Sequence, residues 1–216
     1  AMPKAFAHIR NEFGDELELL HDIHERIEPI EAVNLLKEFA KYRPFFIEDP
    51  LSPEDLGYFK FLRQHTTVPI AMGELFNSPH EWTPLITERL IDFIRVHISQ
   101  AGGLTPARKI AALGEFFNVR TAWHGPGDLS PLGHACNAHL DLAIRNFGIQ
   151  ESLMFNDATR EVFSGCPTYK NGYMFVNEAP GWGVDIDEEK AKKYPFPEHP
   201  GYWEPVRRRD GTAVRP

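Results

Sequence analysis

The stretch FFIEDP, residues 45–50, joins three large apolar residues directly to two carboxylates and a proline. Phe45, Phe46 and Ile47 have the composition of a short strand that is buried on both faces. Acids at the end of such a strand either begin a solvated turn or belong to a site. The other strand-like stretches of the chain decide between these two interpretations.

The same unit, a strand followed by a helix, recurs along the first 150 residues. Within 28–42, for example, Ile30, Val33 and Leu36 have helical spacing. Strands alternating with helices predict parallel pairing and an α/β fold. The expected strands are 17–23, 45–50, 69–75, 92–98, 119–125 and 148–153, and the expected helices are 1–14, 28–42, 53–66, 78–90, 104–118 and 130–145.

A doubly wound open sheet and a closed (β/α)₈ barrel both fit this alternation. Polar residues recur at the same end of nearly every strand, which favours the barrel, because barrel active sites form at the carboxyl ends of the strands. Six strands are two short of eight, so we expect the chain to be part of a longer protein. We expect residues 1–160 to form a partial barrel of about six βα units. Residues 161–216, rich in Gly, Pro and aromatic residues, are expected to be a C-terminal extension packing on the barrel.

Three expected strands end in a carboxylate at a constant interval: Asp22, Glu48 and Glu74 are each 26 residues apart. Successive barrel strands are neighbours, so this interval predicts three carboxylates side by side. Each pair at ~4 Å would repel by on the order of 4 kcal/mol at an effective dielectric of ~20, so protons or a cation must neutralise them. An all-oxygen ligand set suits Mg²⁺. The competing interpretation is that these acids are helix N-caps or form salt bridges at the rim.

Further polar residues occupy the strand ends. His24 lies two residues after Asp22 and so faces the same way on a strand. His97, taken alone, is interpreted as a packed or hydrogen-bonded histidine, whereas His124, which is followed by GPGD, is interpreted as functional. The remaining candidates are Arg95, Asp128 and Glu151.

The composition, 42% hydrophobic and 25% charged, is that of an ordinary globular protein. The chain has 23 basic and 31 acidic residues and a net charge of −8, which argues against a nucleic-acid or anionic-membrane partner. Cys136 and Cys166 lie in unrelated contexts, which indicates reduced thiols and a cytoplasmic location. No apolar run approaches the ~20 residues that span a bilayer. Residues 1–14 predict an amphipathic helix without an export signal. We also expect a homo-oligomer.

Several motifs resemble the enolase superfamily, specifically its mannonate dehydratase subgroup. Asp, Glu and Glu on three successive strands are shared by the whole superfamily, while HDIH and HGPGDLSP point to the subgroup. The resemblance covers essentially all 216 residues. It includes HDIH (21–24), FFIEDPLSPED (45–55), GELFNS (73–78), ISQAGGLTPARKIA (98–111), HGPGDLSP (124–131), NFGIQE (146–151) and APGWGVDIDEE (179–189).

The resemblance implies the C-terminal portion of a modified (β/α)₇β, TIM-like barrel. The N-terminal α+β capping domain and the first strands would lie outside this sequence. It further implies a Mg²⁺-dependent hydro-lyase of carbohydrate metabolism, which removes the α-proton of a sugar acid and expels the β-hydroxyl as water. The expected conversion is of D-mannonate and/or D-gluconate to 2-keto-3-deoxygluconate. The subgroup's base is a Tyr assisted by an Arg in the N-terminal part, so we expect the fragment alone to be inactive.

The resemblance also assigns residue roles. Asp22, Glu48 and Glu74 would be the metal ligands, and His24 would be the general acid that protonates the leaving hydroxide. Asp49 would orient Glu48 or cap the following turn. Other branches use a base like His124 paired with an aspartate on the preceding strand, but HISQAGG (97–103) offers none, so His124 is not assigned as the base. The substrate would contact His24, Glu74, Arg95, His124, Asp128 and Glu151.

Two features favour a member with low efficiency. Pro126 in HGPGD resembles the slow or inactive members, and the tail DGTAVRP (210–216) lacks the terminal tryptophans of the efficient group. The alternative function is therefore an inactive or regulatory homologue that binds a sugar acid. A racemase is a third possibility, and it would need a base on each side of the α-carbon.

Overall fold

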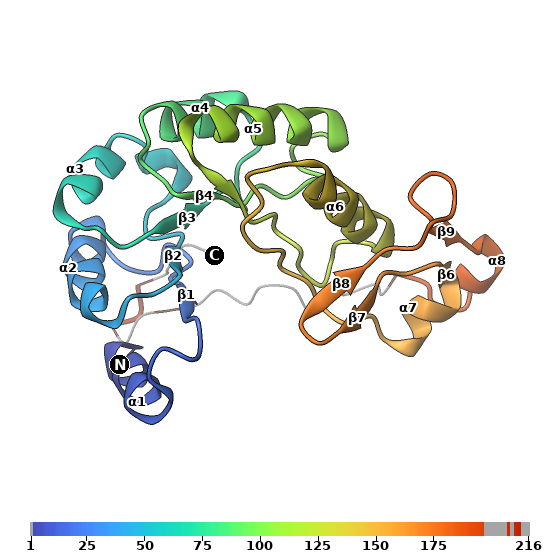
Figure 1. Cartoon of the computed structure of the whole chain (residues 1–216), viewed down its shortest axis with the longest axis horizontal. Helices are drawn as coiled ribbons and strands as arrows, with labels where there is room; N and C mark the ends of the chain where they lie inside the picture. Colours follow the sequence, from blue (N-terminus) through green and yellow to red (C-terminus); the bar gives the residue numbers. More distant parts are fainter. Residues whose placement is uncertain (1, 197–206, 208–209, 213–216) are drawn as a thin grey trace.

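The computed structural model describes residues 2–196, 207 and 210–212 of the 216-residue chain. Within them, a parallel sheet has the order β1-β2-β3-β4-β5, in which each strand pairs with the next along the chain. In Figure 1 these strands line the inner side of an arc, and helices α2 to α6 form its outer side. The strands are Leu20–Asp22 (β1), Phe46–Glu48 (β2), Ile70–Met72 (β3), Phe93–Ile94 (β4) and Arg120–Thr121 (β5).

Every expected helix has a counterpart in the structure, generally shorter than predicted. A serine N-cap followed by a proline explains where two of the helices begin. Ser78 and Ser130 are the N-caps, and Pro79 and Pro131 occupy the first helical positions. The helices of this region are Met2–Phe13 (α1), Pro29–Phe39 (α2), Tyr58–His65 (α3), Pro79–Thr87 (α4), Leu104–Phe117 (α5) and Pro131–Ala143 (α6).

The helix expected at 53–66 was predicted wrongly at its start. Pro53–Asp55 form a separate 3₁₀ turn, capped by Ser52, and α3 begins only at Tyr58. Gly57 lies between the two, and glycine is a poor helix former, so the two segments do not merge.

Successive side chains of a strand point to opposite faces of the sheet, so the apolar residues form two layers. Ile47, Ile70 and Ile94 belong to the large core between the sheet and the outer helices. Phe46 and Phe93 belong to a smaller cluster with Ala71 and Ala122, and their rings lie 5.2 Å apart between centroids. Side chains two residues apart on a strand share a face, so the second cluster lies on the inner side of the arc. The helix-covered parallel sheet confirms the α/β prediction.

The sixth strand, predicted at 148–153, is not a hydrogen-bonded strand in the structure. One isolated parallel bridge, between Thr121 and Phe147, begins the segment, and the residues after it are irregular. Backbone hydrogen bonds join Asn146, Gly148 and Ile149 to Thr121. Beyond them side chains make the contacts: Gln150 Nε2 donates to Trp123 O at 3.1 Å, and Glu151 Oε2 accepts from Gly125 N at 2.9 Å. The segment therefore follows β5 without extending the sheet.

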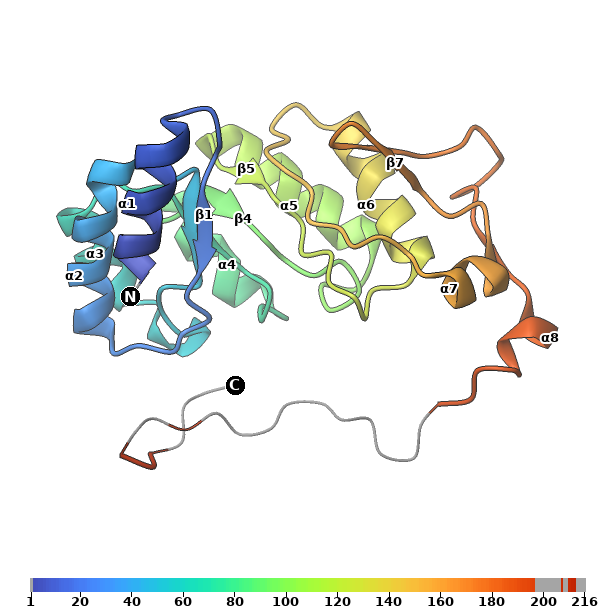
Figure 2. The ribbon, with the colours of Figure 1, turned by 90° about the horizontal axis from the view of Figure 1, so that it is seen from below.

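Helix α1 packs beside α2 next to the β1 edge (Figure 2), where the rings of Phe6 and Phe39 lie 4.7 Å apart. This arrangement confirms the helix predicted over 1–14. In the part of the chain that the structure describes, we find no helix with the length and hydrophobicity of a membrane span.

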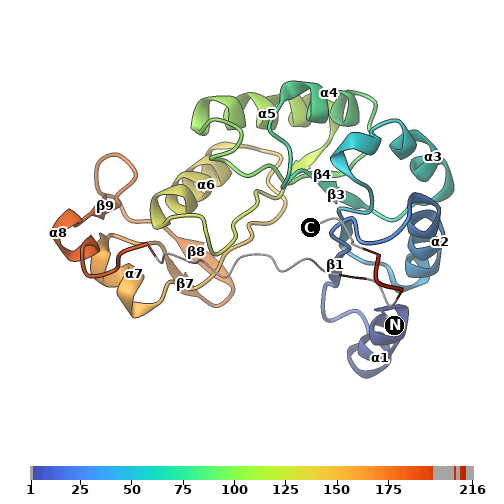
Figure 3. The same cartoon turned by 180° about the vertical axis from the view of Figure 1, so that it is seen from behind.

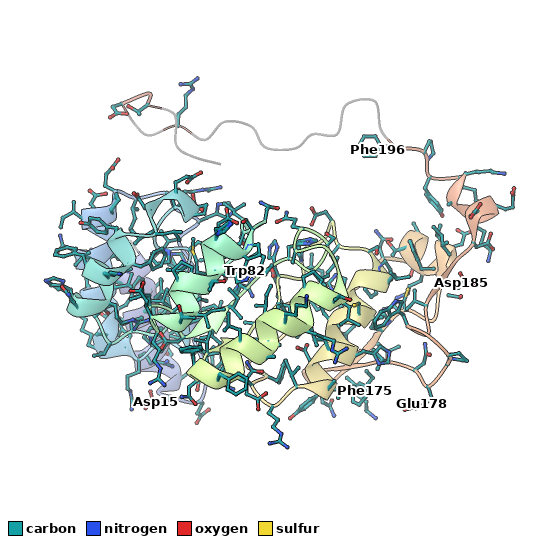
Figure 4. All side chains as sticks on the ribbon, turned by 90° about the horizontal axis from the view of Figure 1, so that it is seen from above. Asp15, Trp82, Phe175, Glu178, Asp185 and Phe196 are labelled. Atoms are coloured by element: carbon teal, nitrogen blue, oxygen red, sulfur yellow. The ribbon has the colours of Figure 1, made fainter. Side chains whose placement is uncertain are left out.

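The segment 156–196 lies at the opposite end of the molecule from α1, as Figures 1 and 3 show. Phe175, Glu178 and Asp185 lie in it, far from Asp15 (Figure 4). Trp182 packs against the main core, and its ring lies 5.9 Å from that of His139 on α6. These contacts support the proposal of a C-terminal extension for residues 161–196; residues 197–206, 208–209 and 213–216 of the predicted extension lie outside the described residues. The elements within 156–196 are Asp157–Val162 (α7), Phe163–Ser164 (β6), Thr168–Lys170 (β7), Tyr173–Phe175 (β8), Asp185–Ile186 (β9) and Glu188–Ala191 (α8), so α7 already begins within the range predicted for the barrel.

The core between sheet and helices predicts a contrast between two phenylalanines. Phe59 on α3 is fully buried, whereas Phe116 on α5 is 84% exposed. Phe59→Ala leaves a cavity and should lower the free energy of unfolding by ~3–5 kcal/mol. Phe116→Ala, the matched control, should change it by less than ~0.5 kcal/mol. Urea unfolding of both variants measures the difference, and equal effects would contradict this assignment of the core.

Asp141 on α6 predicts a pH dependence of stability. Burial raises its pKa from 3.8 to about 8, and the Trp123 indole opposes part of this shift. The folded state thus holds a proton that the unfolded state releases above pH ~4, so this contribution to stability falls as pH rises toward 8. Asp141→Asn should therefore gain stability relative to the wild type between pH 5 and pH 8.

The measurement is the free energy of unfolding in urea at both pH values. Asp185→Asn, at an exposed site in β9, is the matched control and should show no such gain. A difference between Asp141→Asn and the wild type that stays constant over this range would refute the prediction.

Candidate active site

The ends of β1 and β2 place two of the predicted carboxylates next to each other. Asp22 and Glu48 are direct partners in the parallel register. By the two-residue period of a strand, Asp22 shares a face with Leu20, and Glu48 shares a face with Phe46. All four side chains line one cavity, so both acids lie on the inner side of the arc.

Glu74 joins them from beyond the end of β3, which Gly73 makes possible. Gly73 has φ +141°, and a Cβ there would lie 3.0 Å from Val96 N and 3.1 Å from Arg95 N. The backbone just after β4 thus lies so close to Gly73 that a larger residue there would be strained. The chain can thus turn at Gly73 and direct Glu74, which is 8% exposed, into the same cavity.

This cavity has a volume of about 1230 Å³. Aliphatic and aromatic side chains form part of its wall, and the polar residues come from the ends of β1 to β5 and from the 147–151 segment. All eight residues predicted from the sequence line it: Asp22, His24, Glu48, Glu74, Arg95, His124, Asp128 and Glu151.

Arg95, which follows β4, connects three parts of the site. Its Nε forms a close ion pair with Glu48 Oε1, its Nη1 donates to Ala122 O at 3.0 Å, and its Nη2 donates to Glu151 Oε2 at 2.8 Å. Arg95 is 5% exposed, so these three partners replace the hydrogen bonds to water that its guanidinium loses on burial. Arg95 therefore fixes Glu48 and Glu151 on either side of itself.

Glu74 lies between two histidines. His24 Nε2 is 3.1 Å from Glu74 Oε1, and His124 Nε2 is 3.4 Å from Glu74 Oε2. His124 Nε2 also lies 3.7 Å from Glu151 Oε2. His24 thus reaches the carboxylate cluster from the β1 side, and His124 reaches it from the β5 side.

Burial disfavours ionisation of the carboxylate cluster. Burial raises the pKa of Glu48 to about 8; Arg95 lowers it, while the charges of Asp22 and Glu74 raise it further. Burial also raises the pKa of Glu74, against the opposing charge of His24. Burial and the neighbouring carboxylates raise the pKa of Asp49 well above its ordinary value. A cluster of this kind favours any cation that enters it.

On the opposite side of the cavity, the pKa values of two residues are lowered instead of raised. Burial lowers the pKa of His124 to about 4, so its imidazole is neutral near pH 7. For Glu151, burial raises the pKa, but the Arg95 charge and the Gly125 N–H outweigh it, and the pKa is lowered overall. Glu151 is therefore an ionised acceptor beside a neutral ring.

Two overlapping groups of side chains could hold a metal ion, each with its ligand atoms within 4.8 Å of one another. One consists of Asp22, His24 and Glu74, and the other of Glu48, Asp49 and Glu74. Within the described ranges, the predicted trio is not itself a group this tight, because Arg95 holds Glu48 and His24 holds Glu74. Glu74 is common to both groups and joins them. The oxygen-rich donors fit a hard divalent cation.

The structure rules out one of the two roles expected for Asp49, that of capping the following turn. It is 1% exposed, and neither of its carboxylate oxygens accepts a hydrogen bond from the described residues, so it does not cap the following turn. Its backbone is in the left-handed region with φ 41°, as is that of His24 with φ 52°. Such conformations cost about 1–3 kcal/mol each in residues other than glycine and occur preferentially at functional sites.

Sequence reasoning assigned no functional role to His97 or Gln100, which also line the cavity. His97 is 5% exposed, and its Nδ1 lies 2.8 Å from Ser99 Oγ, which confirms the prediction of a packed, hydrogen-bonded histidine. His97 lies two residues after Arg95 and therefore faces the same way on a strand, and this spacing could have predicted that it lines the cavity.

Comparisons with known proteins agree with this arrangement. The chain is 52% identical over 216 residues to a D-galactonate dehydratase family member from Salmonella enteritidis and 53% identical to one from Pantoea ananatis; each match covers 100% of this chain and 52% of the relative. The chain therefore spans about half the length of the curated relatives it matches.

Solved structures give the same result. A crystal structure of an enolase from Pantoea ananatis with bound D-gluconate and Mg has a TM-score of 0.97 at 53% identity, covering 100% of this chain and 52% of that one. A putative galactarate dehydratase from Agrobacterium radiobacter, bound to Na and L-malate, has a TM-score of 0.86 at 28% identity, covering 98% and 57%.

The family model described as enolase C-terminal domain-like matches residues 1–190. The chain thus has the TIM-barrel-like α/β fold of that domain, with the parallel sheet and strand-end carboxylates described above. On the evidence of this match and of the two solved structures, the chain belongs to the enolase C-terminal domain-like family.

Proposed function

We propose that the protein containing this chain is a Mg²⁺-dependent sugar-acid dehydratase of the mannonate dehydratase subgroup. It converts D-mannonate, D-gluconate or both to 2-keto-3-deoxygluconate, with low efficiency. The observation that carries the proposal is the buried carboxylate cluster of Glu48, Asp49 and Glu74, which lies beside His24 in one large cavity. The relative from Pantoea ananatis with D-gluconate and Mg bound supports both the ligand class and the metal.

The residues present fit a magnesium ion. Glu74 shares one candidate ligand group with Asp22 and the other with Glu48, and burial raises the pKa values of Glu48 and Glu74, so a cation would favour their ionised forms. Mg²⁺ bound there would polarise the carboxylate of the sugar acid and stabilise the negative charge that forms when the α-proton leaves.

The groups on the β4 and β5 side suit the rest of the substrate. Arg95 presents a planar fork that matches a carboxylate, although Glu48 and Glu151 occupy part of it. Glu151 and Asp128 accept hydrogen bonds from hydroxyls. His124, neutral near pH 7, can accept a hydrogen bond or donate one without adding charge.

We assign to His24 the donation of a proton to the departing hydroxyl. Its Nε2 is 3.1 Å from Glu74 Oε1, so a carboxylate proposed to bind the metal orients the ring at the edge of the cluster. Elimination breaks the β carbon–oxygen bond, and the leaving hydroxide becomes water by taking the His24 proton. The enol that results tautomerises to the 2-keto acid. The base that removes the α-proton is expected outside this sequence.

Pro126 favours one second candidate, a homologue that binds sugar acids without useful turnover. Pro126 lines the cavity between His124 and Asp128, where it restricts the backbone. The two candidates differ in one experiment on the full-length protein. D-gluconate that raises the melting temperature in the presence of Mg²⁺ and is converted to 2-keto-3-deoxygluconate supports the dehydratase, and stabilisation without conversion supports the binding protein.

The metal assignment predicts a loss of Mg²⁺ affinity when a single oxygen donor is changed. Glu74→Gln should weaken Mg²⁺ binding by more than about a hundredfold, because Glu74 is common to both candidate ligand groups. Calorimetric titration of the full-length protein with Mg²⁺ measures this. Glu115→Gln, on the exposed outer side of α5, is the matched control and should bind Mg²⁺ as the wild type does. An unaltered affinity in Glu74→Gln would rule out this metal site.

If His24 is the general acid, its replacement should slow elimination of the hydroxyl without stopping exchange of the α-hydrogen. His24→Gln should lower the rate of 2-keto-3-deoxygluconate formation by ~10²–10⁴-fold, because the hydroxide then leaves without a general acid. Exchange of the substrate α-hydrogen with D₂O should persist, since the base is a different residue. NMR of recovered substrate and product measures both rates. His80→Gln, exposed on α4, should leave both unchanged, and loss of exchange together with elimination would contradict the assignment of His24 as the acid.

A further inference from the structure

His97 lies in the cavity wall just beyond β4, and none of the roles proposed above uses it. Its backbone forms a parallel bridge with His124, and the two rings meet edge to face with centroids 5.4 Å apart. It lines the same cavity as the three carboxylates and is 5% exposed. A side chain as buried as this one is held in a defined orientation, and its polar atoms require partners.

Ser99 determines which ring nitrogen of His97 carries the proton. The backbone N–H of Ser99 lies 3.3 Å from His97 Nδ1, and Ser99 Oγ lies 2.8 Å from the same atom. A backbone N–H can only donate, so Nδ1 is the acceptor and the neutral ring carries its hydrogen on Nε2. Burial lowers the pKa of His97, although the charges of Asp128 and Glu151 act in the opposite direction. The side chain is thus a neutral donor.

Asp128 supplies the complementary acceptor. It lines the cavity with His97 and is close enough for its charge to act on the ring. A sugar hydroxyl both donates and accepts, so an Nε2–H and a carboxylate together match it. A ligand carboxylate fits this position less well, because Asp128 and Glu151 would repel it.

We propose that His97 is a specificity-determining residue whose Nε2–H donates to a hydroxyl of the bound acid sugar. Ser99 is the positioning residue that sets this tautomer. The inference rests on the proposed function, because it requires an acid sugar beside Asp22, Glu48 and Glu74. It extends that function by naming the group that distinguishes one hydroxyl pattern from another.

The test compares binding of D-gluconate with binding of its monodeoxy analogues to the full-length protein in the presence of Mg²⁺, by calorimetry. His97→Phe keeps a buried ring and removes the donor, so D-gluconate should bind about tenfold more weakly. The analogue that lacks the contacted hydroxyl should bind wild type and variant equally. His80→Phe, at an exposed position on α4, is the matched control and should change neither.

Two conservative variants keep the test valid if His97→Phe does not fold. Glutamine can place an N–H near the position of Nε2, whereas asparagine reaches only the position of Nδ1. His97→Gln should therefore retain most of the affinity for D-gluconate, and His97→Asn should lose it. Thermal unfolding of each variant establishes that it is folded before binding is measured.

The outcomes separate the two proposals. Wild type that binds neither Mg²⁺ nor D-gluconate would overturn the proposed function and this inference with it. Wild type that binds both, with His97 variants that lose the same factor for every analogue, would reduce His97 to a structural role and overturn this inference alone. Unchanged affinity in all three His97 variants would overturn it equally.

Discussion

The structure depends on one buried guanidinium. Arg95 is almost fully enclosed and divides its donors among a carboxylate at the end of β2, a carbonyl beyond β5 and a carboxylate of the 147–151 segment. Removing one partner from such an arrangement typically costs about 3–5 kcal/mol, because the remaining charges stay buried and unpaired. Arg95 is thus what allows Glu48 to lie inside the molecule next to other acids. The same contact ties the irregular closing segment to the sheet.

The site contains more buried carboxyl groups than Arg95 pairs with. Glu48 and Glu74 have raised pKa values although histidine and arginine side chains contact them, and Asp49 is buried among them without a donor from the described residues. An oxygen-rich concavity of this kind attracts a hard cation, while the neutral His124 and the ionised Glu151 on the other side suit hydroxyl groups. These observations support the proposal that the cation binds near β1 to β3 and the sugar hydroxyls bind near β4 and β5.

Much of this arrangement could be predicted from the sequence, because it depends on intervals along the chain. The 26-residue spacing of Asp22, Glu48 and Glu74 follows from the length of one βα unit, and the register of β1 with β2 places the first two directly side by side. The starts of α4 and α6 follow from a serine with a proline after it. Those features are local, so a single sequence contains enough information to locate them.

What the sequence did not reveal depends on contacts between distant segments. The sixth strand has a suitable composition, but Gln150 and Glu151 bond to the β5 side through their side chains instead of the backbone. Asp49 was expected to orient Glu48 or to cap the following turn, and only the packing around it shows that its oxygens are enclosed. The pairing of Ser99 with His97 is local, but it was not predicted either, because it depends on how the backbone turns after β4.

The prolines that follow the strand ends have a wider consequence. Pro29, Pro53, Pro79 and Pro131 each begin a helical turn shortly after a stretch that contributes to the cavity. A fixed φ at the start of each turn anchors the far end of the loop, so amino acids within the loop can be exchanged without moving the scaffold. A barrel with such anchored loops can acquire new substrate preferences through a few substitutions, and relatives of similar architecture can diverge in chemistry while their folds stay superimposable.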